Sequence, residues 1–371
     1  PVQQAQQLLK EKKIDQALSR LRAADAVPDK TPYERYVIEE TRAAAYVDSG
    51  DYPAAIKSLE AVLTTGVLPP AEAAKRMLAA AQLAYQVKDY ATVVEYADRY
   101  YRTGGTDEQP RLLMAQAYYV QNDFANAAKT VRAVIRSAEA TGKAPSENAL
   151  LMLASSEFKR NDQSAYIDAL EQLVAHYPKS EYWRDLLPAI ARRPGFAARL
   201  TLDLDLLMVA TGAMASPDQY MNAAELALAA GLPGAAAAIL DQGYATGILG
   251  KGGQADRQQR LVAMAKRQSN EDMKGLAQLR GEADAASSGL PWEKLGEAYA
   301  SYGQYDNAVA AFRKAIEKGG LKYPEDAKLH LGVAYLRAGQ RAPAKTTLDS
   351  VAGADGIQDL ARLWLLQGSA K

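Results

Sequence analysis

The residues that could do chemistry are few in this chain of 371 residues. It has no cysteine, which excludes disulfides, thiolate metal sites and cysteine nucleophiles. Its two histidines are His176 and His330, and neither has a serine or carboxylate at a spacing that implies a triad or a metal site. We expect both to be surface or packing residues. Such a chain is a poor candidate for acid–base or metal catalysis, so we predict a protein that is not an enzyme and needs no cofactor.

Two other groups of residues look at first like a metal site and a phosphate-binding loop, but their spacing fits neither. Asp203 and Asp205 alternate with leucines, but carboxylates two residues apart on a helix point to different faces. A helix start, where acidic residues are favoured, is the better interpretation. Gly250-Lys251 lies in a glycine-rich stretch, yet Gly252 stands where a phosphate-binding loop needs serine or threonine.

The composition limits the classes of partner. Forty-four basic and forty-four acidic residues cancel, which argues against nucleic acid as the main partner. The longest apolar run, residues 206–215, is too short to span a bilayer. Abundant alanine favours close-packed helices over sheets. The chain begins with Pro1 and has no charged-then-apolar leader, which we interpret as removal of a secretory signal and a periplasmic or otherwise exported location.

Residues 289–322 show the clearest spacing in the chain. Small and apolar residues recur at three- and four-residue steps, as they do along one face of a helix. They occur in two segments, Trp292, Leu295, Gly296 and Tyr299 in the first and Ala308, Phe312 and Ala315 in the second. Gly303 marks a turn between them, and Gly296 and Ala308 are small because the two helices must approach closely where they cross. The pattern predicts an antiparallel helix pair.

These residues resemble the tetratricopeptide repeat (TPR) family, whose signature is W-x2-L-G-x2-Y followed by A-x3-F. The proline that closes the family pattern is absent, and Gly320 stands there. The resemblance implies an all-α fold, a right-handed superhelical solenoid of TPR-like antiparallel helix pairs. One helix pair cannot bury its own apolar face, so one repeat predicts neighbours.

Further repeats are found from the position that precedes the second helix of each pair. The first four steps between these positions are close to the family's length of about 34 residues. The positions are Ile14, Tyr52, Tyr90, Phe124, Gln163, Leu232, Tyr305 and Arg341. Three residues further on stands a small residue, namely Ala17, Ala55, Val93, Ala127, Ala235, Ala308 or Ala344, with Tyr166 as the exception.

Local signals place other helices. Thr31-Pro32-Tyr33-Glu34 and Ser216-Pro217-Asp218-Gln219 are capping boxes with proline at the first helical position. Further helices are expected at 182–192, from 197, at 254–268, at 270–286 and at 357–367, the last as a cap. The repeat spacing fails between 180 and 215. We therefore predict an N-terminal array at 1–180, a degenerate repeat or joint at 181–215, and a C-terminal array with a capping helix at 216–371.

The family resemblance implies that positions 5, 9 and 12 of each repeat line a concave groove. Three successive repeats carry a leucine, a small polar or amide residue and an aromatic ring there: Leu78, Gln82 and Tyr85; Leu112, Gln116 and Tyr119; Leu151, Ser155 and Phe158. Tyrosine suits a half-wet surface, because its ring covers apolar area while its hydroxyl meets water. The alternative is that the rings pack against the adjacent repeat as core.

The expected function is that of an adaptor or scaffold that holds a protein or peptide segment in this groove. Residues 180–371 also resemble, more loosely, exported proteobacterial TPR proteins, some associated with TonB-type systems. The residues that carry this likeness are Tyr177-Pro178, Glu181-Tyr182-Trp183, residues 224–228 and 243–250, and 361–364. This implies the bacterial cell envelope. Three alternatives stay open: a carbohydrate-binding or polysaccharide-export accessory protein, a structural spacer in an envelope complex, and a protein whose catalytic domain lies outside this sequence.

Overall fold

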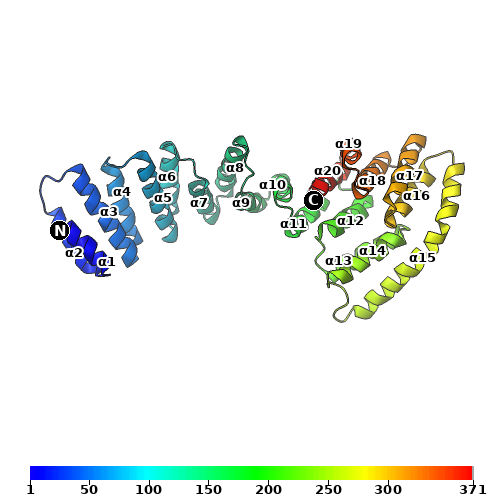
Figure 1. Cartoon of the computed structure of the whole chain (residues 1–371), viewed down its shortest axis with the longest axis horizontal. Coiled ribbons are helices and arrows are strands. Elements are labelled where there is room, and N and C mark those ends of the chain that lie inside the picture. Colours follow the sequence, from blue (N-terminus) through cyan, green and yellow to red (C-terminus); the bar gives the residue numbers. More distant parts are fainter. Residues whose placement is uncertain (370–371) are drawn as a thin grey trace. The chain divides into compact units, whose positions relative to one another are not determined.

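The computed structural model describes residues 1–369, and this part of the chain contains twenty α-helices, one short 3-10 helix and no strand. The prediction of an all-α, TPR-like solenoid is confirmed. The chain divides into two compact units, Pro1–Ala169 (unit 1) and Leu170–Lys371 (unit 2). Figure 1 shows the order of the helices within each of them.

Unit 1 is a regular stack of helix pairs. Each pair packs on the next along the chain, and first helices of successive pairs also touch, α1 on α3, α5 on α7 and α7 on α9. This is the contact pattern of a solenoid, in which repeats meet only their neighbours. Its helices are α1 (Val2–Lys10), α2 (Ile14–Asp25), α3 (Pro32–Ser49), α4 (Tyr52–Thr64), α5 (Pro70–Gln86), α6 (Tyr90–Arg102), α7 (Glu108–Val120), α8 (Phe124–Ala140) and α9 (Glu147–Lys159), and α10 (Gln163–His176) crosses the boundary.

The sequence positions used to define the repeats are the starts of the second helices. Seven of the eight, all but Leu232, are the first residue of a second helix. Leu232 is the cap that precedes α14 (Pro233–Ala245). The seven small residues three positions later are buried, and Tyr166 is half-buried. The positions marked in the sequence therefore coincide with the starts of the second helices and with buried small residues.

The turn inside each pair explains why this frame can be read from sequence. Two residues before seven of the eight marked positions the backbone has a positive φ, for example 61° at Asn122 and 71° at Gly303; at Leu232 the positive-φ residue is Gly231, directly before it. In four of these turns the next residue is an aspartate that caps the second helix; Asp123, for example, accepts a hydrogen bond from the Asn126 N–H at 3.1 Å. A left-handed residue followed by a cap reverses the chain over a short distance.

The two predicted capping boxes are present. Thr31 accepts from the Glu34 N–H at 3.2 Å, and the Glu34 carboxylate accepts from the Thr31 N–H at 2.8 Å. Ser216 and Gln219 repeat this arrangement at the start of α13 (Pro217–Ala229). Both helices begin at proline, as expected from its fixed φ and missing N–H.

Unit 2 contains a long helix in place of one predicted helix pair. The sequence analysis predicts two helices, 254–268 and 270–286, and this is wrong: α15 runs unbroken from Ala255 to Ala285. No proline or left-handed residue interrupts positions 268–271, so the backbone hydrogen bonds continue. The hydroxyl of Tyr302 further donates to Asp272 at 2.6 Å beside the expected break.

The helices of unit 2 close on themselves. Helix α12 contacts α14, α14 contacts α16, α16 contacts α18, α18 contacts α20, and α20 contacts α12. These five helices therefore form a ring (Figure 1). The remaining bounds in unit 2 are α11 (Ser180–Ala191), η1 (Ala198–Leu200), α12 (Thr201–Thr211), α16 (Leu290–Ser301), α17 (Tyr305–Lys318), α18 (Pro324–Arg337), α19 (Arg341–Asp349) and α20 (Ile357–Ser369).

Arginines on one short segment hold the ring closed. Arg199 donates two hydrogen bonds of 2.9 Å to Asp326 of α18 and also pairs with Asp355 at 2.8 Å. Arg193 pairs with Asp359 of α20 at 2.8 Å. Bidentate arginine–carboxylate pairs are among the stronger hydrogen-bonded contacts in proteins. The segment that follows the break after α11 is thus tied to the last helices of the chain.

The predicted division into residues 1–180, 181–215 and 216–371 stays a prediction. It was drawn from repeat spacing, whereas the two compact units divide at residues 169 and 170. Residues 181–215 do include the break predicted there, since α11 ends at Ala191 and a 3-10 turn precedes α12. The predicted last helix at 357–367 is α20, with Trp364 buried.

The crossing of α16 and α17 gives a test of the repeat frame. Ala308 is fully buried against Leu331 and Ala334 of α18, so Ala308→Leu should overpack the site and lower the free energy of unfolding by roughly 1–3 kcal/mol. Ala310→Leu, on the exposed side of α17, is the matched control and should change it by at most about 0.5 kcal/mol. Denaturant unfolding of both variants measures this. Equal stability of the two would show that the frame is misplaced here.

Candidate functional site

The predicted groove residues lie on three successive first helices of unit 1. Leu78, Gln82 and Tyr85 are on α5, and the second and third sets are on α7 and α9 in the same order. Within each set the spacing is four and then three residues, so the three side chains share one face of their helix. None of the nine residues is buried.

The aromatic rings of the row are partly covered, and each is covered within its own repeat. Tyr85 meets the ring of Tyr90 edge-on with centroids 5.7 Å apart, and Tyr119 meets Phe124 in the same way at 5.1 Å. Phe158, which is 61% exposed, lies 5.3 Å from the ring of Tyr166. The second helix of each repeat thus supports the ring; Tyr85 and Tyr119 are half-buried, and Phe158 is exposed.

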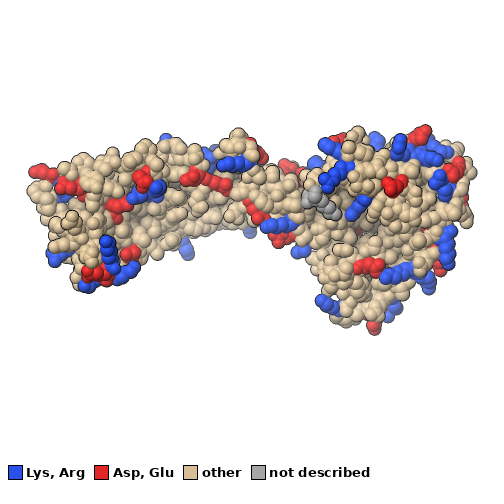
Figure 2. Space-filling model, in the orientation of Figure 1, with Lys and Arg blue, Asp and Glu red and all other residues tan. Residues whose placement is uncertain are grey.

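The surface charge gives this row no strong field. In Figure 2, lysines and arginines are interspersed with aspartates and glutamates on the face shown, in keeping with equal numbers of basic and acidic residues. The contacts available to a ligand on the row are therefore apolar area, amide and hydroxyl hydrogen bonds, and ring faces. Whether the row binds a ligand stays a prediction.

Unit 2 contains a cavity of about 710 Å³ inside its ring of helices, which the sequence analysis did not predict. One part of its wall is apolar and comes mainly from α12, α13 and α14, with Leu202, Leu206, Val209, Leu226, Leu232 and Ile239. The other part is charged and comes from η1, α12, α16 and α18, with Arg199, Asp203, Glu293, Glu297, Asp326 and His330. A volume of this size is typical of small-molecule sites.

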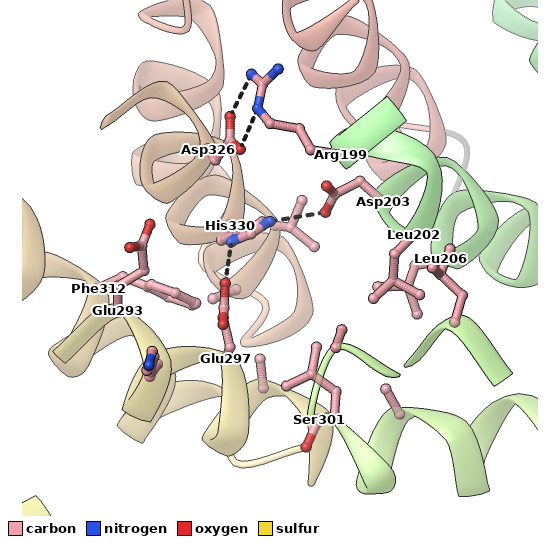
Figure 3. A pocket seen from close by; sticks show the side chains of 18 of the residues that line it. Arg199, Leu202, Asp203, Leu206, Glu293, Glu297, Ser301, Phe312, Asp326 and His330 are labelled. Carbon is pink, nitrogen blue, oxygen red and sulfur yellow. Dashed lines mark hydrogen bonds and ion pairs between the residues drawn. The ribbon is translucent and has the colours of Figure 1, made fainter. Parts of the chain in front are cut away.

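His330 is the centre of the charged part. Its Nε2 lies 2.9 Å from an Oδ1 of Asp203, and its Nδ1 lies 3.6 Å from an Oε1 of Glu297. The side chain is 22% exposed. Figure 3 shows the imidazole between carboxylates that come from α12 and α16, with Arg199 and Asp326 beside it. One histidine therefore links three helices of the ring.

The carboxylates set the protonation state of this histidine. Burial by itself would lower the pKa of His330, but Asp203 and Glu297 outweigh it and raise this pKa to about 10. Burial also raises the pKa of Glu297, and the His330 charge only partly offsets this. The pKa of Glu293 is raised by burial first and by Glu297 next. At neutral pH the imidazole is a cation without a free lone pair.

This arrangement does not make His330 a general base. A protonated His330 cannot take a proton as a general base. The hydroxyl of Ser301 donates to the carbonyl of Ala298 at 2.8 Å instead of to a base. Among residues 1–369, no three histidine, aspartate or glutamate side chains are placed to hold a metal ion. The polar groups of the cavity can instead orient a charged ligand.

The sequence analysis placed Asp203 and His330 on the correct parts of their helices but did not predict the ion pair between them. Asp203 lies in the first turn of α12, as predicted, and His330 lies on the first helix of a repeat. His330 was expected to be a surface or packing residue, whereas it forms the charged cluster with Asp203, which is 127 positions away. No local spacing signals such a pair; only ring closure brings it together. His176, at the end of α10, is exposed as expected.

The raised pKa predicts how unit 2 responds to pH. Because folding raises the pKa of His330 from about 6.5 to about 10, its stabilising effect is complete below pH 6.5 and is lost as pH rises through 10. Chemical denaturation of the wild type and of His330→Gln should differ most near pH 6, with the wild type more stable. The difference should shrink steadily toward pH 10.5. A difference that is independent of pH would contradict the charged cluster.

The comparisons with known proteins agree with the repeat frame. Family models described as tetratricopeptide repeat match residues 41–108, 148–180 and 293–356. The first of these ranges lies in unit 1 and the last in unit 2. A search of curated proteins finds no match. In the part of the chain that the structure describes, no helix is long and apolar enough to cross a membrane.

Similar solved structures are also helical repeat proteins. The C-terminal part of a TPR repeat-containing protein from Cytophaga hutchinsonii has 11% identity, a TM-score of 0.36, and alignment over 88% of this chain and 99% of that one. A tetratricopeptide repeat protein from Parabacteroides merdae has 13% identity and a TM-score of 0.23 over 90% and 99% of the two chains. Yeast Tom70 has 12% identity and a TM-score of 0.24 over 99% and 94%.

Identities and TM-scores this low carry no argument about function. The assignment instead rests on the sequence matches in both units together with the helix pairs that begin at the marked positions. Repeats of this kind are typical of scaffolds that bind other proteins and do no catalysis. Residues 41–108, 148–180 and 293–356 of the chain are therefore tetratricopeptide repeats.

Proposed function

We propose that this protein is a non-enzymatic adaptor that holds an extended protein segment along the row of leucines, amides and rings on α5, α7 and α9. The observation that carries the proposal is the register of this row. Three neighbouring helices of unit 1 present the same three kinds of side chain in the same order, and all nine side chains are at least partly exposed.

The chemistry of the row fits a peptide chain. Leu78, Leu112 and Leu151 offer apolar contacts at one end of each set, and the rings offer them at the other end. Between them, Gln82 and Gln116 offer amide groups that can both donate to and accept from a peptide backbone. A segment crossing three helices would meet these contacts at a regular spacing, as an extended peptide with periodic side chains requires.

The edge-to-face ring pairs favour a rigid binding surface. Phe124 holds the ring of Tyr119 in one orientation, so little side-chain entropy is lost when a ligand contacts it. Tyrosine and tryptophan in such supported positions are common anchors at interfaces. The alternative from sequence, that the rings pack against the adjacent repeat, stays open, since Tyr85 also packs against a core cluster that includes Leu113 and Ala117 of α7.

A second candidate is recognition of a sugar chain, because rows of tyrosine rings also stack on sugars. The specific observation that favours it is that Tyr85, Tyr119 and Phe158 stand at equivalent positions of successive helices and are all at least partly exposed. The leucine row argues for the peptide, because a glycan has little use for branched aliphatic side chains. Attachment to an envelope complex rests only on the looser sequence resemblance; cell fractionation is its test.

The substitution that tests the groove is Tyr119→Ala. A library of extended peptides and a glycan array are screened first, and we expect peptide ligands. Their affinity should then fall by roughly thirtyfold, about 2 kcal/mol, in Tyr119→Ala, because the middle ring of the row is an anchor. Tyr33→Ala is the matched control: its ring is 63% exposed in the same unit but lies outside the row. The peptide affinity of Tyr33→Ala should equal that of the wild type.

Stability separates binding from packing in the same experiment. Tyr119 is only partly covered, so its removal should lower the free energy of unfolding by about 1 kcal/mol, mainly through loss of the Phe124 pair. A loss of roughly 3–5 kcal/mol would show a core ring. Ligands that are all glycans, or peptides that bind Tyr119→Ala normally, would reject the proposed groove.

A further inference from the structure

The cavity of unit 2 is separate from the row in unit 1, and its wall has two chemically different sides. In Figure 3, Leu202 and Leu206 of α12 lie on one side, and Glu293 and Glu297 of α16 lie on the other with His330. Since both sides border the same volume of about 710 Å³, a molecule inside would contact apolar and charged groups at once.

The charges of the cavity do not all find partners within the protein. Asp203 is paired with His330, and Asp326 is paired with Arg199. Glu297 has only the long 3.6 Å contact to the same histidine. Over residues 1–369, the carboxylate of Glu293 has neither a hydrogen bond nor an ion pair. Among the described residues Glu293 is therefore without an ion pair and Glu297 has only this long one; the charge of His330 lowers the pKa of both, but burial outweighs it.

None of the other cations on the cavity wall forms an ion pair with Glu293 or Glu297, although the charge of Lys294 acts to lower the pKa of Glu297. The ammonium group of Lys322 lies 5.0 Å from the ring centroid of Tyr323, and the guanidinium of Arg337 lies 5.2 Å from that of Trp364. Lys294 follows Glu293 directly on α16 and is exposed, with no ion pair among the described residues. The imidazole Nδ1 of His330 is also buried without a hydrogen-bond partner.

The two carboxylates are positioned to act together. Glu293 and Glu297 are four residues apart on α16, which places them on the same face of the helix, one turn apart. Like charges at this spacing repel each other. Burial and this proximity raise the pKa of Glu293, so an added cation between them would relieve both effects. An anion placed between these two carboxylates would be repelled by both.

We propose that the unit 2 cavity is a binding site for a small amphipathic molecule whose ammonium group lies against Glu293 and Glu297. Its apolar body lies along the leucines of α12 and the small residues of α14. Ala238 of α14 lines this apolar side and is exposed to the cavity, so the wall leaves room there. The site is independent of the peptide row, because it uses no residue of unit 1.

Three probes with the same ten-carbon chain test the head group. We expect isothermal titration of the full protein to show binding of decylammonium, binding of decanol weaker by about tenfold, and still weaker binding of decanoate. The apolar body is common to all three, so the order reports the charge alone. Equal affinity for decylammonium and decanol, tighter binding of decanoate, or no binding of any probe would overturn the proposal.

Variants then locate the site. Glu293→Gln should lower the affinity for decylammonium by about tenfold and leave the affinity for decanol unchanged. This residue has no partner to lose, so folding should not be affected; Glu297→Gln should act in the same direction. Glu317→Gln, exposed on α17, is the matched control and should bind all probes normally. Ala238→Trp should fill the apolar side and abolish binding of all three. Normal binding to Ala238→Trp or Glu293→Gln would place the probes elsewhere and reject the site.

Discussion

The structure depends first on the close approach of the two helices in each repeat. A small residue three positions into the second helix lies where the pair crosses, and in seven of the eight repeats it is buried. At the best-defined repeat, a Cβ added to Gly296 would lie only 2.7 Å from the ring of Phe312, so the first helix must also be small there. The apolar contact that this approach allows then binds one repeat to the next.

This constraint gives different results in the two units. In unit 1 the pairs follow one another regularly, and equivalent positions of α5, α7 and α9 fall into a row. In unit 2 one long helix, α15, replaces a predicted pair, and the helices curve round until α20 meets α12. The first arrangement offers a repeated surface, suited to an extended chain. The second encloses a cavity, suited to a small ligand.

The electrostatics of unit 2 follow from this closure. Asp203, His330 and Glu297 come from α12, α18 and α16, and their charges meet only because the ring is complete. The protonated histidine then stabilises the closed form, while Glu293, on the same wall, forms no ion pair among the described residues. Stabilisation of the ring and the proposed site for a cationic ligand therefore involve the same cluster.

Local sequence determined the helix pairs, because caps, left-handed turns and small residues act over a few neighbouring positions. The capping box at Thr31, the break at Pro194 and the final helix at Ile357 could all be located in this way. The continuous helix α15 could not, since nothing in the residues around Ser269 decides between one helix and two. The ion pair between Asp203 and His330 was equally out of reach. Its partners are far apart in the chain, and only the closure of the ring, in which α20 packs against both α12 and α18, makes them neighbours.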